Sequence, residues 1–93
     1  MFRITKNSGF QITFENGYTV SVQFGPGNYC LNYDCEIGKD EIACGRKGSK
    51  NAECAVFDSN GIFIKNPISG EDNVSSCSTP KEVLSLMNWV SSL

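Results

Sequence analysis

The residues of this chain whose types and spacing could do chemistry fall in two short segments. The first is Gly25-Pro26-Gly27-Asn28-Tyr29-Cys30. Its glycines can bring backbone N–H groups close to an anion, Asn28 offers hydrogen bonds, and Tyr29 offers a ring face for stacking. The alternative is a type II turn with Pro26 and Gly27 at its centre, which merely redirects the chain. Spacing alone favours the turn, because the segment matches neither a P-loop nor a dinucleotide fingerprint.

The second segment is a basic cluster in an otherwise acidic chain, made of Arg46, Lys47 and Lys50. A flexible basic loop can close on phosphate groups. More often such a run is a solvated loop tip, and that interpretation is favoured on spacing alone. If the two segments act together, the ligand-binding residues are Gly25, Gly27, Asn28, Tyr29, Arg46, Lys47 and Lys50.

The sequence contains no recognisable catalytic or metal-binding motif. The chain has no His, so Cys30 lacks the usual base for a nucleophile. The carboxylates of Glu36, Asp40 and Glu41 fall in an irregular charged stretch, which favours a solvated loop over an acid–base pair. No Cys-x-x-Cys spacing occurs among the five cysteines, which are Cys30, Cys35, Cys44, Cys54 and Cys77. We therefore expect free structural thiols, with no catalytic residue, metal or cofactor.

Length and composition place the chain among small globular domains. It has 93 residues, of which 40% are hydrophobic and 19% charged, so we expect a single domain over residues 1–93 with one modest core. The formal net charge of −2 disfavours non-specific nucleic-acid binding, which needs a basic face. No apolar run approaches the roughly 18 residues of a membrane span, and the first residues lack a signal-peptide apolar region. These features predict a cytoplasmic protein without membrane contact.

The clearest strand signals are two runs of alternating apolar and polar residues, at 10–14 and 18–24. A two-residue turn between them would put apolar and polar sets on the same face. A three-residue turn, Glu15-Asn16-Gly17, with Gly17 left-handed in a G1 bulge, avoids this. It predicts three cross-strand pairs: Phe14 with Tyr18, Ile12 with Val20, and Phe10 with Val22.

A second hairpin is predicted from residues 53–57 and 62–65, on either side of the turn-forming Asp58-Ser59-Asn60-Gly61. Its strands are apolar on both faces, which is typical of central strands covered by a helix on one side and by a loop or a second subunit on the other. Because one helix covers only one side of a sheet, we expect a homo-oligomer. Residues 31–52 hold no sustained period and form a long connection, a kind of segment that is usually functional or mobile.

The C-terminal part of the chain predicts a helix. Thr79, Pro80 and Glu82 match an N-cap, a first-turn proline and a capping-box glutamate, so the helix should run from Pro80 to about Ser92. Its apolar stripe is Val83, Leu86, Met87 and Val90, and Leu84 and Trp89 either widen the stripe or face a partner. The expected fold class is α+β: an antiparallel sheet of two hairpins, about four to five strands, with one C-terminal amphipathic helix packed on it.

Three stretches also resemble a family. Residues 19–30, with their SVQFGPGNYC motif, resemble a widespread group of small, mostly uncharacterised bacteriophage proteins. The resemblance continues at residues 52–58, and at Thr79-Pro80-Lys81-Glu82-Val83, where those proteins open their C-terminal helix. This sequence has Phe24 and Phe57 where that group has Trp, a conservative change in an apolar role.

The resemblance implies a phage origin and a location in the host cytoplasm, but it supplies no residue with a known role. A small phage protein without catalytic residues is expected to neutralise something in its host. Two functions remain open. The chain could sequester a nucleotide-like signalling molecule, using the glycine segment for the ligand and the basic cluster for its phosphates, or it could block a host defence or metabolic enzyme through a surface patch. The unusual motif at a strand end adds weight to a binding role for residues 25–29.

Overall fold

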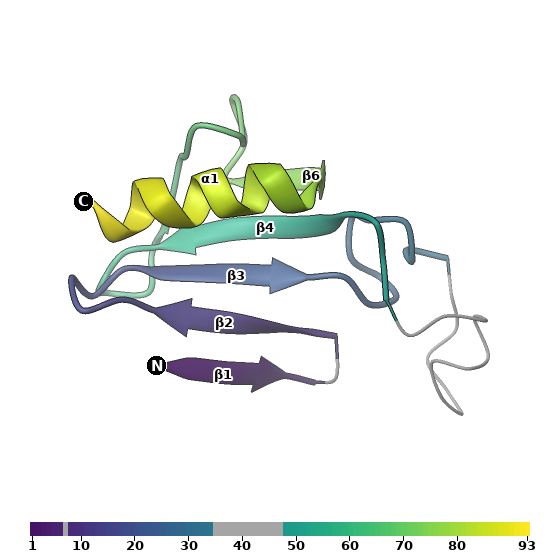
Figure 1. The fold of residues 1–93 in the computed structure, drawn as a ribbon, viewed down its shortest axis with the longest axis horizontal. Helices are drawn as coiled ribbons and strands as arrows, with labels where there is room; N and C mark the ends of the chain where they lie inside the picture. The colour runs from purple at the N-terminus through teal and green to yellow at the C-terminus, as the bar shows by residue number, and fades with distance from the viewer. Residues whose placement is uncertain (7, 35–47) are drawn as a thin grey trace.

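The computed structural model describes residues 1–6, 8–34 and 48–93. Within these ranges, six strands form one antiparallel sheet, and a single helix packs on one of its faces (Figure 1). The elements are β1 (Phe2–Thr5), β2 (Gly9–Thr13), β3 (Thr19–Gln23), β4 (Ala52–Phe57), β5 (Phe63–Ile64), β6 (Val74–Ser78) and α1 (Pro80–Ser91). The expected α+β class with an antiparallel sheet and one packed C-terminal helix is confirmed. Several residues singled out from the sequence lie outside the described ranges: Cys35, Glu36, Asp40, Glu41, Cys44, Arg46 and Lys47.

The first hairpin has the predicted register. β2 and β3 pair Ile12 with Val20 and Phe10 with Val22. The N–H of Phe14 donates to the carbonyl of Tyr18 at 2.9 Å, and Gly17 has a φ of +89°. The three-residue turn is therefore confirmed, because the alternating pattern allows only a register that keeps the apolar set on one face.

The second hairpin also forms, with its first strand longer than its second. β4 is central in the sheet, since it pairs with β3 on one side and with both β5 and β6 on the other. The Asp58 side chain accepts the N–H groups of Asn60 and Ile62, and Gly61 has a φ of +77°. β5 keeps only Phe63 and Ile64 of the expected 62–65 strand, because beyond Ile64 the edge of β4 is taken by β6.

Two strands were not among the predicted hairpins. β1 is only four residues long and pairs with β2, matching Phe2 with Ile12 and Ile4 with Phe10. β6 is a serine-rich strand without apolar alternation, and it pairs with β4 through a register shift. Its buried serines satisfy each other, since the Ser78 hydroxyl donates to the Ser75 hydroxyl at 2.9 Å and the Ser75 hydroxyl donates to the Cys54 carbonyl. Hydrogen-bonding partners therefore place this strand where hydropathy could not.

The helix begins as predicted. The Thr79 hydroxyl accepts the N–H of Glu82 at 3.2 Å, and the Glu82 carboxylate accepts the N–H of Thr79 at 2.9 Å, which completes a capping box. α1 packs on β3 and β4, where its buried Leu86 and Val90 meet the inward face of the sheet. The buried apolar residues of this core are Val20, Val22, Ala52, Cys54, Val56, Leu86 and Val90.

The far end of α1 is tied to the first hairpin by one side chain. The amide nitrogen of Asn16 donates to the carbonyls of Val90 at 2.8 Å and Leu93 at 3.2 Å. The amide oxygen of Asn16 accepts the N–H of Tyr18 at 3.1 Å. The turn between β2 and β3 therefore supplies a side-chain donor at the C-terminal end of α1, where helix carbonyls lack the usual intrahelical donors.

Candidate functional site

The Gly25 to Tyr29 loop forms a tight turn at the end of β3. The N–H of Asn28 donates to the carbonyl of Gly25 at 3.2 Å, and Gly27 has a φ of +83°. With Pro26 before Gly27, this is the type II turn that the sequence offered as the alternative to a ligand loop. The amide of Asn28 also donates to the Gly25 carbonyl, so its side chain helps to close the turn.

The backbone N–H groups of this loop are donated within the molecule. That of Gly25 donates to the Ser8 carbonyl at 3.1 Å, and that of Gly27 to the Tyr33 carbonyl at 3.0 Å. That of Tyr29 donates to the Glu53 carboxylate at 3.2 Å. An anion-binding loop needs free N–H groups that converge on the ligand. The geometry therefore favours a structural role for the two glycines.

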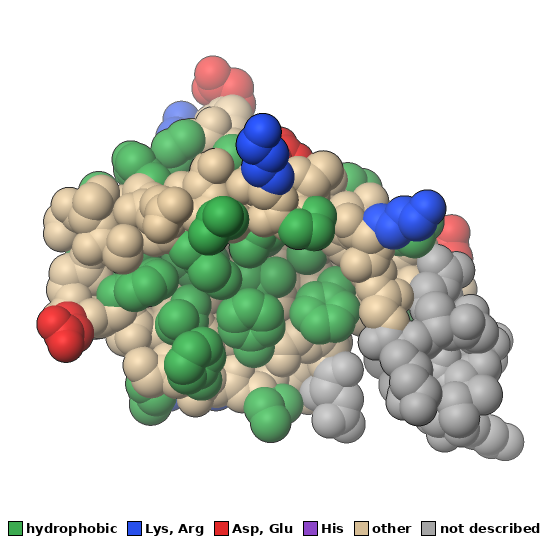
Figure 2. Space-filling view, in the orientation of Figure 1, with side chains coloured by type: hydrophobic (Ala, Val, Ile, Leu, Met, Phe, Trp, Pro, Cys, Tyr) green, Lys and Arg blue, Asp and Glu red, His purple; other side chains and the backbone are tan. Residues whose placement is uncertain are grey.

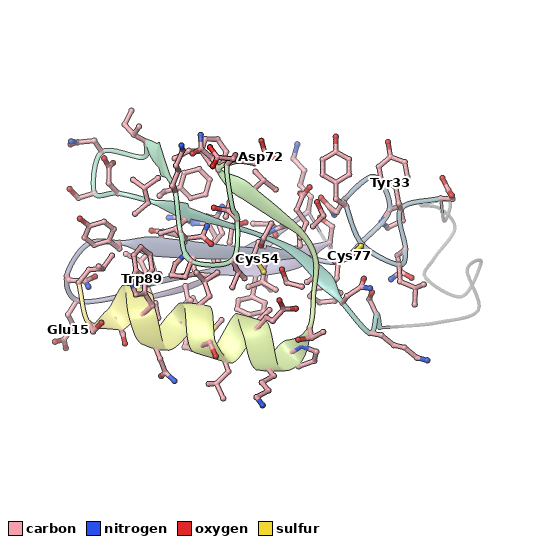
Figure 3. All side chains as sticks on the ribbon, turned by 90° about the horizontal axis from the view of Figure 1, so that it is seen from above. Glu15, Tyr33, Cys54, Asp72, Cys77 and Trp89 are labelled. Atoms are coloured by element: carbon pink, nitrogen blue, oxygen red, sulfur yellow. The ribbon has the colours of Figure 1, made fainter. Side chains whose placement is uncertain are left out.

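Tyr29 lies on the surface and not in the core. Its side chain is 56% exposed and stacks on Tyr33, with ring centroids 5.8 Å apart and an interplanar angle of 7°. Figure 3 shows Tyr33 on the side of the sheet opposite α1. The Tyr29 carbonyl accepts the N–H of Cys77 at 2.9 Å, so the main chain of this loop is anchored while its rings face solvent.

The cysteines of the described part of the chain are free thiols. Cys30 and Cys54 are buried and Cys77 is exposed. Burial raises the pKa of the Cys54 thiol from 9.0 to about 11, against the lowering effect of hydrogen bonds from Ser75 and Ser78. Cys54 is therefore protonated at neutral pH and behaves as a small apolar core residue, as Figure 3 shows by its position between α1 and the sheet.

Lys50 faces a cavity that the described residues of the glycine segment do not line. It lines an open cavity of about 430 Å³ between the N-terminal half of α1 and the sheet. None of Gly25, Gly27, Asn28 and Tyr29 lines this cavity.

The two segments are nevertheless neighbours, because the N–H of Leu31 donates to the Asn51 side chain at 2.6 Å and the Asn32 amide donates to the Gly48 carbonyl at 3.1 Å. A joint ligand site of Lys50 and the glycine segment stays a prediction.

The walls of the cavity are mostly apolar. The helix contributes Val83, Leu84 and Met87, and the sheet contributes Phe10 of β2 and Val22 of β3. The remaining lining residues are Phe24, Gly48, Ser49, Lys50, Asn51, Ala52, Ser78 and Pro80. Leu84 is 60% exposed, so this flank of α1 presents a large apolar side chain to solvent.

The apolar surface continues from the cavity to the edge of the sheet. Cross-strand partners lie on the same face, so Phe2 and Ile4 of β1 extend the row made by Ile12 and Phe10 of β2. Phe2 is 78% exposed and Ile4 is 81% exposed. Figure 2 shows hydrophobic side chains gathered on this face beside α1. We call the cavity together with the exposed faces of Phe2, Ile4 and Ile12 the apolar groove.

The opposite face of the sheet is mixed in character. Beside β1 to β3 it is polar, with the Thr13 and Thr19 hydroxyls hydrogen-bonded at 2.9 Å. Beside β4 and β5 it is aromatic, where the rings of Phe57 and Phe63 have centroids 4.5 Å apart. Ala55 of β4 is buried on this side. The second hairpin therefore is apolar on both faces, and the homo-oligomer expected on that ground stays a prediction.

Sequence reasoning missed the apolar groove, although one signal of it was present. Phe2-Arg3-Ile4-Thr5 alternates apolar and polar residues, but four residues at the start of a chain are a weak strand signal. Leu84 was expected either to widen the buried stripe or to face a partner, and the structure leaves it largely exposed.

Comparison with protein-family models, with curated proteins and with solved structures finds no match for this chain. The function has to be inferred from the chain's own residues. Among those that the structure describes, no cluster of ligating side chains could hold a metal ion. No helix in the same ranges has the length and apolar character needed to cross a bilayer.

Proposed function

We propose that this protein is a non-enzymatic binding protein that acts by docking another protein in the apolar groove. The observation that carries the proposal is the exposure of Phe2, Ile4 and Leu84 around a preformed apolar cavity. At about 150 to 250 Å² for a fully exposed aromatic side chain, and somewhat less for an aliphatic one, these three residues leave on the order of 400 Å² of apolar surface in water. A patch of about this size is the largest on a typical monomer, and such patches often serve binding.

The biological setting comes from the resemblance to small bacteriophage proteins. In that setting the partner is a host defence or metabolic enzyme, and the protein acts in the host cytoplasm by covering a surface of that enzyme. Binding alone is sufficient for such an inhibitor, which agrees with a sequence that has no histidine and no legible catalytic group.

The test is a quantitative pull-down from lysate of the natural cell, with the full chain as bait. We expect one partner in near-stoichiometric amount, and loss of that partner with the double substitution Ile4→Gln and Leu84→Gln. The control is Ile62→Gln, which changes a side chain as exposed as Leu84, at 60%, but beyond the groove, in the turn before β5. A partner that the double variant retains, or that Ile62→Gln also loses, would contradict the proposal.

A second function, sequestration of a nucleotide-like signalling molecule, has one supporting observation. The exposed, stacked rings of Tyr29 and Tyr33 offer a platform on which a base could stack for about 1 to 3 kcal/mol. The Glu53 carboxylate, which accepts the Tyr29 N–H, disfavours a phosphate at this place because the two negative charges repel. Isothermal titration with cyclic nucleotides and ADP-ribose derivatives separates the two functions. A Kd near or below about 1 μM would favour sequestration over protein docking.

A further inference from the structure

We propose that the apolar groove receives an amphipathic α-helix of the partner protein, laid alongside α1, with acidic side chains where it passes Lys50. This inference rests on the proposed function and names the structural class of the segment that is bound.

The width of the uncovered sheet face fits one helix. Neighbouring strands lie about 4.8 Å apart, and packed helices lie about 8 to 10 Å apart, so one helix covers about two strands. α1 covers β3 and β4. β1 and β2 remain beside it, as Figure 1 shows, and they provide about one further helix width.

Backbone hydrogen bonding favours a helix over an extended segment on this face. An extended peptide lying flat on apolar side chains leaves many of its N–H and C=O groups without partners, which costs free energy when water is excluded. A helix satisfies these groups internally and presents an apolar stripe to the sheet. The sheet contributes the apolar side chains of Phe10 and Val22 to the groove, and these suit that stripe.

The helix of a second copy of this chain is a poor occupant. The stripe of α1 that contains Leu86 and Val90 is already buried on its own sheet. The outer face of α1 carries exposed polar side chains, among them Lys81, Ser85 and Asn88. A second α1 could enter the groove only with this polar face against Phe10 and Ile4. Because α1 is the one helix among the described residues, a helical occupant is expected to come from a different protein.

The charge at one end of the groove sets the composition of the occupant. Among the described residues that line the cavity, Lys50 is the one that carries a charge. Lys6, which is also exposed, follows β1 at the same end, because Thr5 pairs with Gly9 there. Acidic side chains on the occupant are favoured next to these two amines. The negative C-terminal end of the helix dipole is favoured at the same place, so the occupant runs antiparallel to α1, which begins at Pro80 beside Lys50.

The test is a selection from random peptides of about 20 residues, long enough for a helix that spans the groove, against the whole protein. We expect enriched peptides with apolar residues at i, i+3, i+4 and i+7 and with acidic residues toward one end. Their helical circular dichroism should rise on binding. Leu84→Gln should weaken binding at least about tenfold, as expected for a central apolar contact, and Ile62→Gln should leave it within about twofold.

Charge reversal gives a second readout. Lys50→Glu should weaken binding of the acidic peptides about three- to tenfold at low ionic strength. Added salt should reduce this difference in affinity. The matched control is Lys65→Glu, at an exposed lysine whose nearest acidic partner is Glu71 at 3.9 Å.

Three outcomes overturn the inference. The first is enrichment of peptides with a period of two that bind without gaining helicity, which would place an added strand on the free edge of β1. The second is helical peptides whose affinity does not change with Leu84→Gln. If no peptide binds while the pull-down still returns a groove-dependent partner, the helix inference fails and the proposed function stands, since the groove then receives a folded surface.

Discussion

Two leucines on α1 differ by two positions and should differ widely in what they contribute to stability. Leu86 is 1% exposed and packs in the core, whereas Leu84 is 60% exposed on the flank of the helix. Replacing either leucine by alanine should not weaken the helix itself, because Ala has the highest helix propensity. Replacing each by alanine therefore isolates burial from propensity.

The magnitude follows from the position of each side chain. Leu86→Ala removes a fully buried side chain between α1 and the sheet, and such changes cost about 2 to 5 kcal/mol. Leu84→Ala removes a side chain that is already mostly in water, so we expect a change within about 1 kcal/mol. For a domain of this size about 1 kcal/mol corresponds to about 4 to 8 °C in Tm. Leu86→Ala should thus melt at least about 8 °C lower, and Leu84→Ala within a few degrees of the unaltered protein.

Urea unfolding followed by far-UV circular dichroism measures both changes. Fluorescence of Trp89, the only tryptophan of the chain, gives a second probe on the same helix. The m-value should stay the same, because neither substitution changes the surface exposed on unfolding by much. Equal losses for the two variants, or a Leu86→Ala loss below about 1 kcal/mol, would show that α1 does not dock on β3 and β4 as described.

Four further expectations can be checked by stability and size measurements. Gly9→Ala should lower the free energy of unfolding by about 1 to 3 kcal/mol, because the new Cβ would clash with the Val22 carbonyl oxygen and lie 2.8 Å from the Gln23 Cα. Gly48→Ala is the control, since a Cβ there has nothing within 4 Å. The raised pKa of Cys54 gives stability that is complete below about pH 9 and lost as pH rises to about 11, on the order of 2 kcal/mol, and Cys54→Ala should remove this alkaline loss from the unfolding curve. Tyr29→Ala should lower the free energy of unfolding by less than about 1.5 kcal/mol, because the exposed ring loses mainly its stacking on Tyr33. A much lower melting temperature would show that the ring supports the fold. Light scattering should detect a homo-oligomer, and a monomer at all concentrations would remove that expectation.

The parts of the fold that the sequence predicts are those governed by local rules. The register of β2 and β3 follows from alternation, since a shift of one residue would turn Ile12 and Val20 to the other face. The start of α1 follows from a Thr79 cap that only needs its neighbour Glu82. The central place of β4 follows from residues that are apolar on both faces.

Contacts between distant segments decided the rest. β6 lacks a hydrophobic pattern and is held by hydrogen bonds to β4, which no local rule reveals. The glycine segment after β3 was compatible with two roles, and only distant acceptors such as Ser8 and Glu53 show that its N–H groups are already donated. The apolar groove depends on how far one helix reaches across a five-strand-wide sheet. Periodicity determines which side chains share a face. Whether that face is covered depends on the width of the helix compared with that of the sheet, and this comparison is possible only once the tertiary structure is known.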